Sequence, residues 1–270
     1  MCEYGNQDNP GRRAQSATGA PAAAGGQAQE AEIEAYAAPA EPALPDTDFE
    51  LDRGRAALVV VDPLVDFLHP DGVAWPVVGD NVQQLGTVDN LERLLVAAQN
   101  AEMPVLVSPH YYYPHDHDWD FAGPLEAWMH GEGMFDIESR FGSIEGTGAD
   151  FLPQLKPYFI DGRAVICSPH KVYGPQSNDV VLQLRKRGIE QVVLAGMSAN
   201  LCVESHLRDL LEQGLRVGVV TDATAAAQVP EGDGYLAALI NFRFIANGIW
   251  TTQEAVAKID ALATSSPARH

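Results

Sequence analysis

Two kinds of hydrophobic pattern alternate along this chain from about residue 56 onward. Short, almost wholly apolar runs are typical of buried strands, and stretches with an apolar residue at every third or fourth position are typical of amphipathic helices. The runs predict strands at residues 56–62, 104–109, 163–168, 191–196, 216–221 and 248–252. The periodic stretches predict helices at residues 87–101, 177–187, 201–213 and 232–246. This alternation predicts a three-layer α/β/α sandwich around a mostly parallel, doubly wound, six-stranded sheet.

Two segments interrupt the pattern. Residues 1–50 are rich in Ala, Gly, Gln, Pro and Glu and hold few large aliphatic side chains, so we expect a disordered or extended N-terminal tail. We expect a single domain over residues 51–264. Within it, residues 110–150 form an insertion between the second and third strands that is too long for a plain connection. Long insertions of this kind often serve as lids or partner surfaces.

Reactive side chains follow three of the predicted strands. Asp62 ends the first strand, Lys171 follows the third, and Cys202 follows the fourth at the start of a helix. Catalytic groups of parallel sheets gather at the carboxyl ends of strands. We expect a lowered pKa for the Cys202 thiol, because a helix dipole and free backbone N–H groups favour the thiolate. The alternatives are an inert buried cysteine and a surface lysine in a loop.

These residues stand in motifs that resemble the isochorismatase-like cysteine hydrolases, a family that includes nicotinamidases and other amidohydrolases. The motifs are Asp62-Pro-Leu-Val-Asp66-Phe67, a mid-chain Lys171, and Gly196-Met-Ser-Ala-Asn200-Leu-Cys202-Val203. The resemblance covers roughly residues 55–260. One departure is that many members carry Gln where this chain has Leu64, which removes a polar group near the mouth of the site.

The resemblance implies the family's fold and a Cys-Asp-Lys triad that works through a thioester intermediate. Cys202 would be the nucleophile, Asp62 would carry a proton from the thiol to the leaving amine, and Lys171 would stabilise the thiolate. The backbone N–H groups of Ser198 and Cys202 would form the oxyanion hole. A non-proline cis peptide would join Met197 to Ser198. We therefore expect an enzyme that hydrolyses a carbon–nitrogen bond, other than a peptide bond, in a small amide, ureide or imide.

Two other functions stay open beside this one. The first is vinyl-ether hydrolysis of isochorismate, but members with that activity lack the nucleophilic cysteine, so Cys202 argues against it. The second is a non-enzymatic binding or scaffold protein on the same fold. The joint presence of Asp62, Lys171 and Cys202 argues against this alternative, because a protein without catalytic activity would not need all three.

Aromatic side chains are concentrated around the expected mouth of the site. The candidates for substrate binding are Phe67, Trp75, Tyr111, Tyr112 and Trp119. A flat or apolar small molecule would suit such a wall, although aromatic side chains also simply pack. Aromatic residues are enriched at subunit interfaces, so the insertion also favours a homo-oligomer.

The insertion invites a metal-binding interpretation as well. The side chains that could serve as ligands are His110, His115, Asp116, His117 and Asp118. Some nicotinamidases bind a metal through an Asp-x-His pair after the second strand, and the matching pair here is His110 and Tyr112. Tyrosine is a poor replacement ligand. We therefore expect no metal and no other cofactor, and the His110–Asp118 cluster is the alternative.

The net charge and the cysteine content indicate which binding partners and which cellular compartment suit this protein. A formal net charge of −20 repels nucleic acid and anionic lipid. The 3 cysteines are too few and uneven for a disulfide framework, which favours the cytoplasm. The sequence holds no apolar run of about 18 residues, so we expect no membrane span. If Met1 is an added start codon, Cys2 and its polar tether would instead fit a lipidated mature N-terminus.

Overall fold

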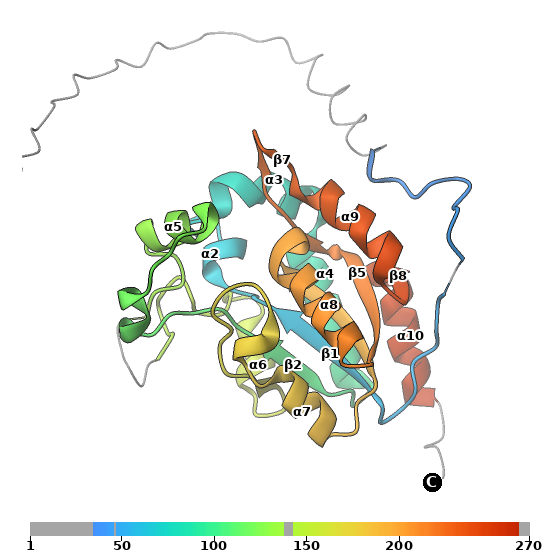
Figure 1. The fold of residues 1–270 in the computed structure, drawn as a ribbon. Coiled ribbons are helices and arrows are strands. Elements are labelled where there is room, and N and C mark those ends of the chain that lie inside the picture. Colours follow the sequence, from blue (N-terminus) through green and yellow to red (C-terminus); the bar gives the residue numbers. More distant parts are fainter. Residues whose placement is uncertain (1–34, 46, 138–142, 265–270) are drawn as a thin grey trace, which may run out of the picture. The chain divides into compact units, whose positions relative to one another are not determined.

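A six-stranded, all-parallel sheet forms the centre of the protein in the computed structural model, which describes residues 35–45, 47–137 and 143–264. Its strands lie in the order β3-β2-β1-β4-β5-β8 (Figure 1). Their bounds are β1 Ala56–Val61, β2 Val105–Ser108, β3 Val165–Ile166, β4 Gln191–Met197, β5 Arg216–Ala225 and β8 Gly248–Trp250. The expected doubly wound sheet is therefore confirmed, and each expected strand is present.

Helices cover both faces of this sheet, with α3, α4 and α10 on one face and α7, α8 and α9 on the other (Figure 1). The longer helices are α3 Trp75–Leu85, α4 Thr87–Asn100, α5 Pro124–Gly131, α7 Val180–Lys186, α8 Glu204–Glu212, α9 Gly234–Ile245 and α10 Thr252–Thr264. The short ones are α2 Val65–Leu68, α6 Lys156–Ile160, η1 Pro114–Asp118, η2 Pro175–Ser177 and η3 Ala199–Val203. A small antiparallel ribbon pairs β6 Gln228–Val229 with β7 Gly232–Asp233.

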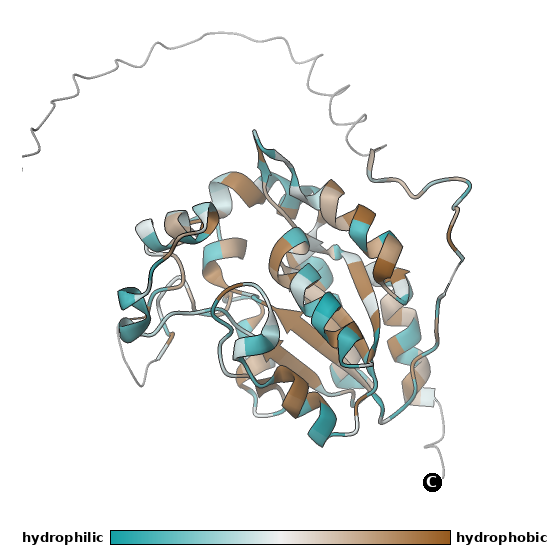
Figure 2. Ribbon diagram, viewed as in Figure 1, coloured by the Kyte–Doolittle hydropathy of each residue, from teal (hydrophilic) through white to brown (hydrophobic). Residues whose placement is uncertain are grey.

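The apolar runs of the sequence become the buried centre of the sheet. All six residues of β1 and all seven of β4 are buried, because helices cover both faces of a parallel sheet. Figure 2 shows this distribution, with apolar colour on the strands and polar colour on the outward faces of the helices. Within the described ranges, no helix combines the length and apolar character needed to cross a membrane.

The sheet order brings β1 and β4 together at the point where the chain changes direction. From β1 the chain builds β2 and β3 on one side, and it then returns to add β4, β5 and β8 on the other. Val61 pairs with Gly196 at the carboxyl ends of the two strands. Ligand and catalytic sites of open α/β sheets lie at such a switch point, just beyond the strand ends.

The segment before β1 packs on the last strand and helix. Asp48 accepts hydrogen bonds from the Trp250 indole at 2.7 Å and from Lys258 Nζ at 3.0 Å. The ring of Phe49 lies against that of Trp250, with centroids 5.0 Å apart. The final residues of the expected tail therefore belong to the packed domain, while residues 1–34 lie outside the described part of the chain.

Candidate active site

Four neighbouring strand ends each deliver one polar side chain to the same buried place. His170, His110, Asp62 and Cys202 follow β3, β2, β1 and β4, which is the order of the strands in the sheet. One nitrogen, oxygen or sulfur atom from each lies within 4.8 Å of the others. All four residues are buried, with exposed fractions between 0 and 3%. We call this group the strand-end cluster.

Asp62 is the centre of the strand-end cluster. Its φ of 48° lies in the left-handed region, which a side chain other than glycine rarely adopts and which often marks a functional site. Its two carboxylate oxygens lie 3.0 and 3.1 Å from His170 Nε2. The Cys202 thiol and the backbone N–H of His110 also hydrogen-bond to the carboxylate. Burial raises the pKa of Asp62 above its ordinary value, and these hydrogen bonds only partly offset the rise.

The turn that carries Cys202 begins at Gly196, where only glycine fits. Its φ is +117°, and a Cβ atom there would collide with the backbone of Val61. This close approach holds the end of β4 against the residue that precedes Asp62. A cis peptide then joins Met197 to Ser198, as the resemblance implies. Cys202 follows within η3, a single π-helical turn ahead of α8.

The resting state of Cys202 differs from the expectation based on the helix dipole. Burial, the charge of Asp62 and the hydrogen bond to Asp62 raise the pKa of the Cys202 thiol well above its ordinary value. Backbone hydrogen bonds at Ser198 and Cys202 act in the opposite direction but are outweighed. The expected lowered pKa is therefore wrong for this state of the protein. The sulfur rests as a thiol that donates its proton toward Asp62.

Lys171 does not occupy the position expected for it beside Asp62. Its Nζ donates to Asp116 at 2.6 Å and to the carbonyl oxygen of Tyr111 at 2.8 Å, and it lies 4.0 Å from the centre of the Tyr113 ring. These contacts fasten the first turn of the insertion to the end of β3. The group that lies beside the Asp62 carboxylate is the preceding residue, His170.

His206 supports the cluster from α8 and was not found from the sequence. Its Nδ1 lies 2.6 Å from the carbonyl oxygen of Cys202, and its Nε2 lies 2.8 Å from Ser108 Oγ. Burial and the nearby His170 lower the pKa of His206 to about 3, so the ring is neutral near pH 7. A neutral ring donates from Nδ1 to the Cys202 carbonyl and accepts at Nε2. Its spacing of one helical turn after Cys202 was the available signal.

The five expected substrate-binding residues lie in different surroundings. Tyr112 is fully buried, and its ring packs edge-on against His110 with centroids 5.0 Å apart. Phe67 is buried behind the cluster, against Phe135, which in turn stacks on His110. The other three residues, half-buried Trp75 and Tyr111 and the 46% exposed Trp119, have no described contact with the strand-end cluster.

The histidines of the insertion divide into two places. His110 joins the strand-end cluster, whereas His117 lies 3.2 Å from His130, Nδ1 to Nδ1, and 3.4 Å from Asp136. Asp116 is already bound by Lys171. The structure therefore does not gather the His110–Asp118 stretch into one ligand set.

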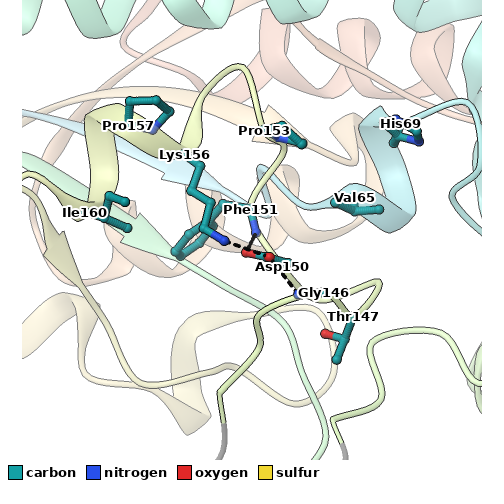
Figure 3. A pocket seen from close by; sticks show the side chains of 10 residues that line it. All are labelled: Val65, His69, Gly146, Thr147, Asp150, Phe151, Pro153, Lys156, Pro157 and Ile160. Atoms are coloured by element: carbon teal, nitrogen blue, oxygen red, sulfur yellow. Dashed lines mark hydrogen bonds and ion pairs between the residues drawn. The ribbon is translucent and has the colours of Figure 1, made fainter.

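A separate surface hollow of about 460 Å³ lies between α2 and α6 (Figure 3). The residues that line it are Val65, His69, Gly146, Thr147, Asp150, Phe151, Pro153, Lys156, Pro157 and Ile160. Asp150 accepts from Lys156 Nζ at 2.8 Å and from the Gly146 N–H at 2.9 Å. No member of the strand-end cluster lines this hollow, so we do not regard it as the place of the reaction.

Comparison with known proteins decides the family. Residues 56–255 match the isochorismatase domain. The chain belongs to the isochorismatase family. This confirms the resemblance drawn from the motifs, and the matched range includes all four residues of the strand-end cluster.

Two curated members of the family are similar in sequence. Ureidoacrylate amidohydrolase RutB of Variovorax paradoxus is 26% identical over 195 residues, which cover 68% of this chain and 73% of that protein. Nicotinamidase 3 of Arabidopsis thaliana is 29% identical over 178 residues, which cover 63% and 73% respectively.

Solved structures share the isochorismatase-like fold. A cysteine hydrolase from Pseudomonas syringae pv. phaseolicola matches with a TM-score of 0.68 and 20% identity, over 82% of this chain and 100% of that one. N-carbamoylsarcosine amidase from Thermoplasma acidophilum matches with a TM-score of 0.54 and 22% identity, over 74% and 98%.

Proposed function

We propose that this isochorismatase-family protein is a cysteine hydrolase that cleaves a carbon–nitrogen bond of a small molecule. The observation that carries the proposal is that the Cys202 sulfur lies within 4.8 Å of a carboxylate oxygen of Asp62, while His170 Nε2 lies 3.0 and 3.1 Å from the two oxygens of that carboxylate. A nucleophile, a proton acceptor and a group that orients the acceptor are the parts that nucleophilic catalysis requires. Here they lie side by side at the switch point of the sheet.

The first step transfers a proton as the nucleophile attacks. Asp62 takes the thiol proton while the sulfur of Cys202 forms a bond to the carbonyl carbon of the substrate. Burial and the charge of Asp62 raise the pKa of the Cys202 thiol, so the sulfur keeps its proton until the substrate arrives. In this proposal His170 takes the place of the lysine in the expected triad and acts as a positioning residue.

The next steps complete the hydrolysis. The carbonyl oxygen becomes an oxyanion, which the backbone N–H groups of Ser198 and Cys202 stabilise. Protonated Asp62 gives its proton to the leaving nitrogen, the carbon–nitrogen bond breaks, and a thioester on Cys202 remains. Asp62 then takes a proton from water, the hydroxide attacks the thioester, and the carboxylic acid and the thiol are released.

The substrate class that we propose is a small amide, ureide or imide. RutB, nicotinamidase 3 and N-carbamoylsarcosine amidase are named for substrates of this kind, which supports the class. Burial raises the pKa of both Tyr112 and Tyr173, and the charge of Glu126 adds a smaller rise. Both phenols therefore stay protonated near Cys202 and could donate to a carbonyl or amide group.

A parallel screen of small amides, ureides and imides tests the proposal. Wild type should release ammonia or an amine from at least one compound, and Cys202→Ala should release none. Mass spectrometry of the quenched reaction should show the acyl group on the peptide that contains Cys202. Turnover of a substrate by Cys202→Ala at the wild-type rate would refute the covalent route, and would favour hydrolysis without a thiol, as in the vinyl-ether alternative.

We also propose that the protein works in the cytoplasm as a homo-oligomer. Cys167 and Cys202 are free thiols in the described structure, which suits a reducing compartment. Trp119 and Trp128 are exposed by 46% and 39%, and exposed aromatic side chains favour a subunit interface. Light scattering coupled to gel filtration tests the assembly, and a monomeric mass would contradict it.

A further inference from the structure

The strand-end cluster has the composition of a metal site as well as that of a thiol catalyst. Asp62, His110, His170 and Cys202 supply one oxygen, two nitrogens and one sulfur. Zinc accepts all three kinds of donor and is usually bound by four of them in a tetrahedron. Zinc–nitrogen and zinc–sulfur bonds of about 2.0–2.3 Å place such donors roughly 3.3–3.8 Å apart. The present separations of at most 4.8 Å exceed the upper end of that range by no more than about 1 Å.

The two histidines carry a second, independent sign of a ligand. Within the described residues, Nδ1 of His110 and Nδ1 of His170 are buried and have no hydrogen-bond partner. Both residues are at least 99% buried, and a buried polar atom without a partner is rare and calls for an explanation. His110 Nε2 lies 3.2 Å from the carbonyl oxygen of Lys171. Metal-binding histidines commonly donate their second nitrogen to a backbone carbonyl in this way.

Charge balance favours a dication in the same place. With Asp62 and Cys202 ionised, the buried group would carry a charge of about −2, and an isolated buried charge is strongly unfavourable. A divalent ion bound by one carboxylate, one thiolate and two neutral imidazoles gives a neutral site.

We propose that the strand-end cluster binds one zinc-like divalent cation, and that this ion masks the Cys202 nucleophile. On binding, the S–H bond of Cys202 breaks, a sulfur–metal bond forms, and the proton leaves to solvent, with no change of oxidation state. Of the His110 and Tyr112 pair that matches the metal pair of some nicotinamidases, only His110 belongs to this ligand set. Only the inhibitory consequence rests on the proposed hydrolase function; the binding does not.

A metal titration of the full chain tests the binding directly. Protein freed of metal with a chelator is titrated with Co²⁺ in an absorption spectrometer and with Zn²⁺ in a calorimeter. Wild type should bind one equivalent, release about one proton and show a thiolate-to-cobalt charge-transfer band. Cys202→Ser should lose that band. His110→Gln should weaken zinc binding by at least about 10-fold, because even the loss of a residue that only hydrogen-bonds to a metal ligand typically costs that much affinity. The matched control is His115→Gln, whose side chain is 55% exposed, and it should bind like wild type.

The outcomes separate this inference from the proposed function. A stoichiometry near zero, or a cobalt spectrum unchanged in Cys202→Ser, would overturn the metal site. Circular dichroism of each variant shows whether a loss of binding reflects misfolding, and the near-isosteric Cys202→Ser keeps the test valid if His110→Gln does not fold. Amide hydrolysis by the stripped enzyme, with no metal bound on titration, would refute the metal site alone. Metal binding without hydrolysis by the stripped enzyme would refute the proposed function alone.

Discussion

A single nitrogen of His170 lies 3.0 and 3.1 Å from the two carboxylate oxygens of Asp62, while Lys171, the next residue along the chain, points to Asp116. The segment is extended here, because His170 pairs with His110 in a parallel bridge. Successive side chains of extended backbone point to opposite sides. One of the two cationic candidates must therefore face the cluster and the other must face away from it.

This arrangement predicts different pH profiles for variants at the two positions. His170 lowers the pKa of Asp62 against the larger effect of burial, so His170→Ala should raise that pKa. Because activity requires ionised Asp62, the acidic limb of kcat/KM should move to higher pH, and kcat should fall by about 100-fold or more. Lys171→Ala should leave the acidic limb in place. If the acidic limb moved only in Lys171→Ala, Lys171 and not His170 would be the third member of the triad.

The two buried cysteines offer a matched pair of substitutions. Cys202→Ala should abolish turnover, because loss of a nucleophile typically removes several powers of ten in rate. Cys167→Ala should keep turnover within about threefold, since burial raises the pKa of Cys167 to about 12 and no step of the proposed mechanism uses it. Both residues are 2–3% exposed, so the cost in stability should be similar. Equal loss of activity in both variants would point to misfolding as the cause.

Asp62→Asn should make Cys202 more reactive while it stops turnover. The charge of Asp62 and its hydrogen bond both raise the thiol pKa, and the amide removes them. Alkylation by iodoacetamide should therefore begin at lower pH in metal-free Asp62→Asn than in wild type. Peptide mapping by mass spectrometry follows Cys202 and uses Cys167 in the same sample as the reference. Superimposable curves for Cys202 in the two proteins would show that Asp62 does not act on the thiol.

The sheet was predictable because each strand is a contiguous apolar run, and this needs no knowledge of distant contacts. Helix α10 was missed although Ala255, Ile259 and Leu262 are all buried on one face, because small alanines around them blur the periodicity. Helix α3 was missed as well. Its start at Trp75-Pro76 was the available signal, because proline is favoured in the first turn of a helix.

The site was predictable to the level of strand ends and no further. Asp62 and Cys202 lie together because the strand order puts β1 beside β4. The choice between His170 and Lys171 depends on which of two adjacent residues faces inward, and the motif marked the lysine. The direction of the Cys202 pKa shift depends on burial and on the neighbouring carboxylate, and both arise from tertiary packing.

Two truncations should distinguish the tail from the packed segment. Removal of residues 1–45 should change the melting temperature by no more than a few degrees, because their composition offers little apolar surface to bury. Removal of residues 1–50 deletes the contacts of Asp48 and Phe49 with Trp250 and Lys258, and should lower it further. Thermal unfolding of the two truncated proteins measures the difference. Equal melting temperatures would show that the segment at 48–50 adds nothing to stability.

His206 should make the protein sensitive to acid in a definite window. Its pKa is lowered from an ordinary value of 6.5 to about 3, so its contribution to stability is fully present above pH 6.5 and is lost as pH falls toward 3. Between these two pKa values, one such group lowers the free energy of unfolding by about 1.4 kcal/mol for each unit that the pH falls. Between pH 7 and pH 4.5 the free energy of unfolding should therefore fall by about 2–3 kcal/mol more in wild type than in His206→Gln.

Urea denaturation at the two pH values measures both, with His69→Gln, whose side chain is 40% exposed, as the control that should follow wild type. His110 also has a lowered pKa and remains in all three proteins, so its effect cancels in the comparison. An equal loss in wild type and His206→Gln would show that His206 is not the group that responds to acid.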